Sequence, residues 1–198
     1  MLYNLIIMYA KDIKVSFYNK PGVLKLVKPD PKYAPLTIKW IAKKEVTQYL
    51  GADFSKITMD DEVNHLSEML TNEDCYSWMI KLDDRIVGNV EINGIKELSD
   101  KYGVKTGAFC TLIGEPADWG GGLGTCSKQA ACNWAFEEGG FDLIEAKAYV
   151  QNVRSWGALE KIGYEYHGIE KGEVENEPVE WKVYTLKKAA WAELNWPK

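Results

Sequence analysis

The sequence predicts a single mixed α/β domain of the α+β kind, with a mostly antiparallel central sheet and helices on both of its faces. Three observations support this fold class. Strand-like runs occur in pairs joined by short turns, which is the pattern of antiparallel hairpins. Segments with apolar residues at helical spacing separate these pairs. The length of 198 residues fits one core, with residues 1–22 as an N-terminal strand or hairpin extension and residues 23–198 as the main domain.

The first strands lie near the N-terminus. Residues 1–12 contain an apolar run without a basic start or a cleavage site, and it is too short to span a bilayer, so we expect a strand there. Strands at residues 13–18 and 23–27 flank a turn signal at residues 19–22 and predict a hairpin.

Two helices follow this hairpin. The first, at residues 33–43, carries Leu36, Trp40 and Ile41 on one side. Thr58 begins the second with a variant capping box to Asp61. The apolar stripe of this second helix consists of Val63, Leu66, Met69 and Leu70.

The rest of the chain alternates strands with helices. Strands at residues 76–82 and 85–93 form the strongest hairpin, around the tight turn Asp83-Asp84. Residues 95–104 are polar and predict an irregular excursion. The segments expected after it are a strand at 105–113, a helix at 125–138, a buried strand at 141–150, a short helix ending at residue 163, strands at 164–169 and 181–186, and a helix at 187–194.

Composition excludes some functions. The formal net charge of −5 disfavours nucleic-acid binding, which needs clustered Lys and Arg, and it is compatible with a cationic substrate. We expect no membrane partner. The cysteines form no C-x-x-C pair, and His65 and His167 are the only histidines, so we expect free thiols in the cytoplasm and no metal site. The four cysteines are Cys75, Cys110, Cys126 and Cys132.

A cluster of glycines separates a strand from a helix. Residues 117–125 read ADWGGGLGT. Such a loop is either a plain turn or a cradle whose amides bind an anion at the positive end of the helix dipole. The loop lacks the G-K-[ST] ending of a Walker loop, and its spacing also fails the dinucleotide fingerprint G-x-G-x-x-G. What it has is an alternation of glycines at 120, 122 and 124.

Two motifs together resemble those of the GNAT family of N-acetyltransferases. Residues 119–125 resemble the family's pyrophosphate loop, [QR]-x-x-G-x-[GA], with Trp119 where Gln or Arg normally stands. Residues 152–164, NVRSWGALEKIGY, resemble the motif N-x-x-S-x-x-x-L-x-K-x-G-[FY] at the expected interval after the loop. The resemblance covers roughly residues 23–186 and is closest to the branch of ribosomal-protein alanine N-acetyltransferases.

The resemblance implies how acetyl-coenzyme A is bound. The sheet is implied to splay between the strands at 105–113 and 143–150, with the pantetheine arm in the split. Backbone groups near Leu112 and Ile113 are implied to pair with the pantetheine amides. The other residues implied to contact the coenzyme are Trp119, Gly120, Gly121, Gly122, Leu123, Gly124, Thr125, Asn152 and Ser155.

The implied reaction is direct attack of a primary amine on the thioester. Many relatives protonate the departing thiolate with a Tyr at the position of Glu160, so here Ser155 is the candidate acid. Ser155 is equally a candidate helix cap, and Asn152 either binds the coenzyme, stabilises the turn, or does both. The candidate base is Glu91, on a polar strand face that either borders the substrate cleft or is a solvated edge. Glu115 is either a further candidate or a surface residue, and Glu145, a carboxylate in an apolar strand that demands a partner, is the other candidate.

The leading hypothesis is an acetyl-coenzyme A-dependent N-acetyltransferase whose acceptor is a protein N-terminus, a polyamine or an aminoglycoside. The alternative is a coenzyme-binding sensor or interaction module without turnover. A dinucleotide-dependent oxidoreductase is disfavoured by the glycine spacing. Trp191 and Trp196 in an exposed C-terminal segment suggest a homodimer contact. Four aromatic residues either line the acceptor pocket or pack the helices onto the sheet: Trp40, Tyr49, Tyr76 and Trp78.

Overall fold

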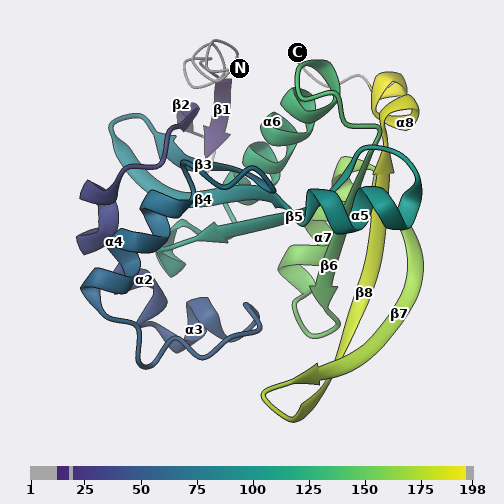
Figure 1. The fold of residues 1–198 in the computed structure, drawn as a ribbon. Helices are drawn as coiled ribbons and strands as arrows, with labels where there is room; N and C mark the ends of the chain where they lie inside the picture. The colour runs from purple at the N-terminus through teal and green to yellow at the C-terminus, as the bar shows by residue number, and fades with distance from the viewer. Residues whose placement is uncertain (1–12, 18–19, 195–198) are drawn as a thin grey trace.

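The computed structural model describes residues 13–17 and 20–194, and these form one sheet with helices on both faces (Figure 1). The fold class predicted from the sequence is confirmed. The strands are β1 (Ile13–Phe17), β2 (Lys20–Val27), β3 (Cys75–Leu82), β4 (Arg85–Asn93), β5 (Thr106–Ile113), β6 (Leu143–Tyr149), β7 (Glu165–Val174) and β8 (Glu177–Lys187). The strand expected at residues 1–12, the turn residues 18 and 19, and Trp196 lie outside the described residues.

The strands follow the order β1-β2-β3-β4-β5-β6-β8-β7. In the described part of the chain, β5 and β6 form the parallel pair, and the other neighbours are antiparallel. The predicted hairpins at the N-terminus and at β3–β4 are both present, but the turn predicted at residues 19–22 is wrong. Lys20, Pro21 and Gly22 belong to β2 and pair with Phe17, Ser16 and Val15 of β1. Because β1 pairs with β2 and β2 with β3, the segment before residue 23 continues the main sheet. The division of the chain at residue 22 stays a prediction.

The sheet opens between β5 and β6. Residues Thr106, Gly107 and Ala108 of β5 pair with Leu143, Ile144 and Glu145 of β6. Beyond these pairs, both strands continue without a ladder between them, to Ile113 and Tyr149, and Figure 1 shows them diverging. A gap lined by backbone groups therefore lies in the middle of the sheet.

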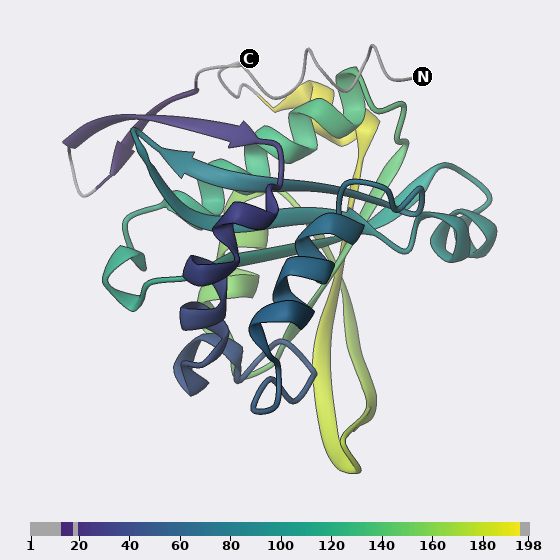
Figure 2. The same ribbon diagram turned by 60° about the vertical axis from the view of Figure 1, so that its left-hand side comes forward.

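Helices cover the two faces of the sheet separately (Figure 2). On one face, Val90 and Ile92 of β4 pack with Leu123 and Ala131 of α6. On the other face, Met79 of β3 belongs to a second apolar cluster with Trp40 and Leu66. The helical elements are η1 (Pro31–Tyr33), α2 (Ala34–Ile41), α3 (Lys44–Thr47), α4 (Met59–Glu68), α5 (Ile95–Tyr102), η2 (Pro116–Asp118), α6 (Leu123–Glu137), α7 (Val153–Ile162) and α8 (Lys188–Glu193).

Local sequence explains several helix ends. The capping box predicted at the start of α4 is present, because the Thr58 hydroxyl accepts from the Asp61 N–H and the Asp61 carboxylate accepts from the Thr58 N–H. The predicted excursion at residues 95–104 is wrong, since most of it forms α5. Gly94 and Gly103 flank this helix with φ of 60° and 70°, and Leu98 is its buried residue. Its single buried side chain gives too little periodicity to be recognised in the sequence.

The C-terminal part differs from expectation in two further ways. Strands β7 and β8 are longer than predicted and form a hairpin that projects from the domain around Glu175 and Asn176, both with positive φ. Trp191 is 3% exposed and its ring lies 6.0 Å from that of Phe136, so the expected exposed dimer contact at Trp191 is wrong. No helix within the described ranges is long and apolar enough to cross a membrane.

Candidate active site

A cavity of about 710 Å³ occupies the gap between β5 and β6. Its walls include the unpaired ends of both strands, the loop before α6, and the starts of α6 and α7. Gly121 and Glu91, which the sequence also predicted for the site, are not among the lining residues. Ten of the residues predicted to contact a ligand line this one cavity: Leu112, Ile113, Trp119, Gly120, Gly122, Leu123, Gly124, Thr125, Asn152 and Ser155.

The glycine loop places the N-terminus of α6 at the cavity. Gly120 and Gly122 have φ of 82° and 91°, a backbone conformation that favours glycine. A Cβ on Gly124 would meet only Ile113 Cγ1, at 3.9 Å, so the space in front of this residue is open. The N–H groups in the first turn of a helix have no partner within the helix and lie at the positive end of its dipole. The mouth of the cavity therefore suits an anionic group.

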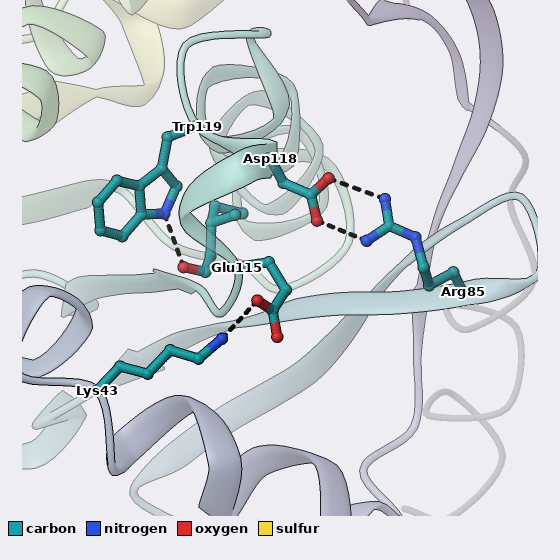
Figure 3. A network of polar contacts seen from close by, with 6 residues as sticks. Lys43, Arg85, Glu115, Asp118 and Trp119 are labelled. Carbon is teal, nitrogen blue, oxygen red and sulfur yellow. Dashed lines mark hydrogen bonds and ion pairs between the residues drawn. The ribbon is translucent and has the colours of Figure 1, made fainter.

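Trp119 connects this loop to the strand before it. Its indole N–H donates a hydrogen bond to the carbonyl oxygen of Ile113 at 2.9 Å, as drawn in Figure 3. The guanidinium of Arg154, from α7, lies 3.8 Å from the centre of the Trp119 ring. Trp119 is thus a structural link between β5, the loop and α7, which explains the residue that departs from the sequence motif.

Two ion pairs hold the segment between β5 and the glycines (Figure 3). Arg85 of β4 binds Asp118 through two hydrogen bonds of 2.6 and 2.9 Å, and the Asp118 side chain is 8% exposed. Lys43 binds the Glu115 carboxylate. Glu115 therefore anchors the loop. Its contact with Lys43 does not support the prediction that Glu115 is a base.

Asn152 and Ser155 lie at the start of α7. The Asn152 side chain is the helix cap, because its Oδ1 accepts the Ser155 N–H at 3.2 Å. Ser155 occupies the third position of the helix, so the hypothesis that it caps the helix is wrong. Ser155 lines the cavity, and its hydroxyl forms no side-chain hydrogen bond with the described residues. The hydroxyl is thus available to a ligand.

Glu91 lies one strand away from the cavity. It pairs across the sheet with Cys110, which lines the cavity, and it accepts a hydrogen bond of 2.9 Å from Asn89 Nδ2. The Cys75 thiol lies 3.9 Å from its other oxygen. Burial raises the pKa of Glu91, although the charge of His65 and hydrogen bonds from neighbouring amides act in the opposite direction. The strand face is therefore a half-buried polar cluster rather than a solvated edge.

Glu145 is occupied elsewhere. It is 3% exposed and accepts hydrogen bonds from Lys101 Nζ at 2.8 Å and from the Tyr102 hydroxyl at 2.5 Å. Burial alone would raise the pKa of Glu145, but these two hydrogen bonds together with the charges of Lys101 and Lys147 keep the pKa below its ordinary value. The buried carboxylate thus has the partners that its sequence context demanded, and this structural role gives no support to Glu145 as a base.

The aromatic residues divide between core and cavity. Trp40, Tyr76 and Trp78 pack in the two apolar clusters, so for them the packing alternative holds. Tyr49 lines the cavity, and its ring lies 5.6 Å from that of Tyr149, which lines it too.

Sequence reasoning missed several polar residues of the cavity wall, among them Thr111 and Lys128. Thr111 follows Phe109 on the same face of β5, and its buried hydroxyl has no hydrogen-bond partner among the described residues. Lys128 is 7% exposed on α6 and also lines the cavity. Its position three residues before Ala131 and seven before Ala135, both fully buried, was the available signal, because a charged residue there interrupts an apolar helix face.

Comparisons with known proteins agree with this geometry. The model of the family described as "Acetyltransferase (GNAT) domain" matches residues 23–165. No curated protein sequence matches the chain significantly. Among the described residues, no three His, Cys, Asp or Glu side chains gather into a metal-binding group.

Solved structures with this fold include enzymes that act on different amines. Spermidine N-acetyltransferase from Vibrio cholerae, in complex with CoA and spermine, is 14% identical, with a TM-score of 0.74 over 86% of this chain and 98% of that one. RimL, a ribosomal L7/L12 alpha-N-protein acetyltransferase in complex with coenzyme A, is 15% identical, with a TM-score of 0.72 over 83% and 93%. The microcin C7 self-immunity acetyltransferase MccE, in complex with acetyl-CoA and AMP, is 19% identical, with a TM-score of 0.71 over 83% and 92%.

Proposed function

The chain belongs to the acetyltransferase (GNAT) family, and on this premise we propose that it transfers the acetyl group of acetyl-coenzyme A to a primary amine. The observation that carries the proposal is a single cavity. It joins the N-terminus of α6 to the parts of β5 and β6 that do not pair with each other. One end of this cavity suits a pyrophosphate, and its middle offers backbone groups to an extended amide-containing arm.

The residues present fit the coenzyme. The first-turn amides of α6 and the open space before Gly124 suit the two phosphates of the pyrophosphate. The groups of β5 near Leu112 that face the gap suit the pantetheine amides, and the Thr111 hydroxyl, which has no partner among the described residues, suits a polar group of the same arm. The carbonyl oxygen of Ile113 already accepts the Trp119 indole N–H, so we assign the pairing with the arm mainly to Leu112. When bound, the coenzyme supplies the activated acyl group.

Glu91 is the proposed base. An alkylammonium has a pKa of about 10, so the acceptor must lose a proton before its nitrogen can attack. Glu91 is half-buried beside the cavity wall, and its raised pKa makes its carboxylate a better proton acceptor than an exposed one. One oxygen is held by Asn89, which orients the group. Cys110 separates Glu91 from the cavity, so we propose that the proton passes along this wall, directly or through one water.

Ser155 is the proposed donor to the coenzyme sulfur. Ser155 lines the cavity from the first turn of α7, and its hydroxyl has no side-chain partner within residues 13–17 and 20–194. Glu160, which stands where many relatives place a Tyr, accepts a hydrogen bond of 2.8 Å from the Tyr184 hydroxyl. This contact gives Glu160 a structural role and leaves Ser155 as the candidate.

The proposed acceptor class rests on the similar structures and on the charge of the chain. The similar structures include one protein named for spermidine and one named for a protein N-terminus, and the chain itself is acidic. We propose a cationic amine, either a polyamine or a protein N-terminus, with an aminoglycoside as the third class to test. A cytoplasmic location fits the free thiols.

The test is an acceptor panel. The full chain is incubated with acetyl-coenzyme A and, in turn, a polyamine, an aminoglycoside and a peptide with a free N-terminus, and the release of free thiol is measured. Acceptor-dependent release supports the enzyme. Coenzyme binding without release for any amine would favour the sensor alternative.

A further inference from the structure

A buried lysine lies in the wall of the cavity without a counter-ion. Lys128 is 7% exposed, and within residues 13–17 and 20–194 its amine has no hydrogen bond or ion pair. The Nζ of Lys128 lies 5.2 Å from the centre of the Phe109 ring. A buried charge without a partner is costly, so a lysine kept in this position indicates a ligand that brings negative charge or a lone pair.

The position of Lys128 within the cavity indicates which part of the ligand it contacts. Phe109 is the first residue of β5 beyond the β5–β6 ladder, so Lys128 lies beside the closed end of the gap. Along β5 the glycine loop lies past Ile113, about 14 Å from Phe109 at 3.4 Å per residue. The backbone of Lys128 is only about 6 Å along α6 from Gly124, so the contact of its ammonium group with the Phe109 ring is what directs it to the closed end. In the coenzyme the phosphates and the sulfur are at opposite ends of the pantetheine arm. If the phosphates lie at the loop, the sulfur lies toward Lys128.

Resting on the proposed function, we infer that Lys128 is the thiolate-binding residue, whose ammonium group holds the coenzyme sulfur when that sulfur carries negative charge. During transfer the acceptor nitrogen forms a bond to the acetyl carbon, and the carbon–sulfur bond breaks. The electron pair of that bond stays on sulfur, where the Lys128 ammonium neutralises it. The ammonium acceptor loses two protons: the first passes through Glu91 to solvent before attack, and Glu91 takes the second from the nitrogen as the carbon–sulfur bond breaks, so atoms and charge balance. Ser155, on the neighbouring helix α7, donates a hydrogen bond to the same sulfur.

Among the described residues, no carboxylate forms an ion pair with Lys128. The ionisable groups that act on it are the thiols of Cys110 on β5 and Cys132 on α6, and the Cys132 thiol lies 3.2 Å from the Tyr164 hydroxyl. Burial raises the pKa of Cys132 to about 12, so this thiol stays neutral at physiological pH. Asp118 also lines the cavity, but both of its oxygens bind Arg85. Burial lowers the pKa of Lys128 to about 8, so its ammonium form still predominates at pH 7.

The experiment measures the ionisation of bound coenzyme A directly. Ultraviolet difference spectra of coenzyme A with the full chain, recorded against the complex with desulfo-coenzyme A, report the thiolate absorbance as a function of pH. In the wild-type protein we expect the bound thiol to titrate about 1–3 pH units below the ordinary thiol pKa of about 8.5. Titration of the bound thiol at its ordinary value overturns the inference.

Variants make the assignment specific. Lys128→Met should abolish the lowering of the pKa of the bound thiol. Lys128→Arg should restore a large part of it, because the positive charge returns. Lys39→Met, at an exposed position on α2, should leave the lowered pKa unchanged. A shift that persists in Lys128→Met overturns the inference. The wild-type titration alone decides the matter if a variant does not fold. Failure of the wild-type protein to bind coenzyme A at all would instead contradict the proposed function.

Discussion

The indole N–H of Trp119 is bonded to the carbonyl oxygen of Ile113 at 2.9 Å, so the first residue of the glycine loop is tied to the last residue of β5. We expect Trp119→Phe to weaken acetyl-coenzyme A binding about fivefold, since it removes a hydrogen bond worth about 1 kcal/mol while keeping a ring for Arg154 to stack on. Calorimetric titration measures this change. An unaltered affinity would mean that the link does not position the loop.

Substitutions at Asn152 and at Ser155 should separate an effect on stability from an effect on catalysis. Asn152→Ala removes the cap of α7 and should lower the free energy of unfolding by about 1 kcal/mol, as measured by urea denaturation. Ser155→Ala leaves the cap in place, so we expect unchanged stability and a kcat at least about tenfold lower. A Ser155→Ala enzyme with full kcat would remove Ser155 from the mechanism.

Glu91→Gln should change the pH dependence of the reaction. The base acts when ionised, so kcat/KM should fall as the pH drops through the raised pKa of Glu91, at a higher pH than for an exposed Glu. In Glu91→Gln this acid limb should disappear, and the rate should fall about 10²–10⁴-fold. Glu97→Gln, at an exposed position on α5, is the matched control. An acid limb that survives in Glu91→Gln would show that another group is the base.

Lys128→Met should stabilise the protein at neutral pH. Burial moves the pKa of Lys128 from 10.5 to about 8, so the folded state binds fewer protons than the unfolded state between these values. Below pH 8 the buried charge costs up to about 3 kcal/mol, and this cost vanishes as the pH rises past 10.5. We expect the variant to exceed wild type in unfolding free energy at pH 7 and to lose that advantage by about pH 10.5. Urea denaturation at both pH values measures this. A variant less stable than wild type at pH 7 would contradict the account.

The sequence predicted the parts of the fold that depend on local pattern. The β3–β4 hairpin, the Thr58–Asp61 capping box and the strand–glycine–helix passage all follow from residues close together in the chain. The two motifs at residues 119–125 and 152–164 also contain many of the residues that line the cavity, because their family resemblance carries information on long-range placement.

Other features depend on contacts that no local pattern reveals. Asn152, and not Ser155, caps α7, and only the side-chain geometry decides between two residues that both favour caps. The partners of Glu145 lie 43 and 44 residues away in α5, a helix that the sequence did not predict. The sequence alone does not explain Trp119, because its hydrogen-bond partner is a backbone carbonyl and its stacking partner comes from α7.

The central claim is that the loop at residues 119–125 holds the coenzyme, and Gly124→Val tests it most directly. Gly124 does not need a positive φ, and its added Cβ would meet only Ile113 Cγ1 at 3.9 Å, so the variant should fold with an unchanged melting temperature. Calorimetric titration with acetyl-coenzyme A should show at least about tenfold weaker binding than in wild type, with Gly121→Ala, off the cavity wall, as the control that binds normally. Equal affinity of wild type and Gly124→Val for acetyl-coenzyme A would contradict the account.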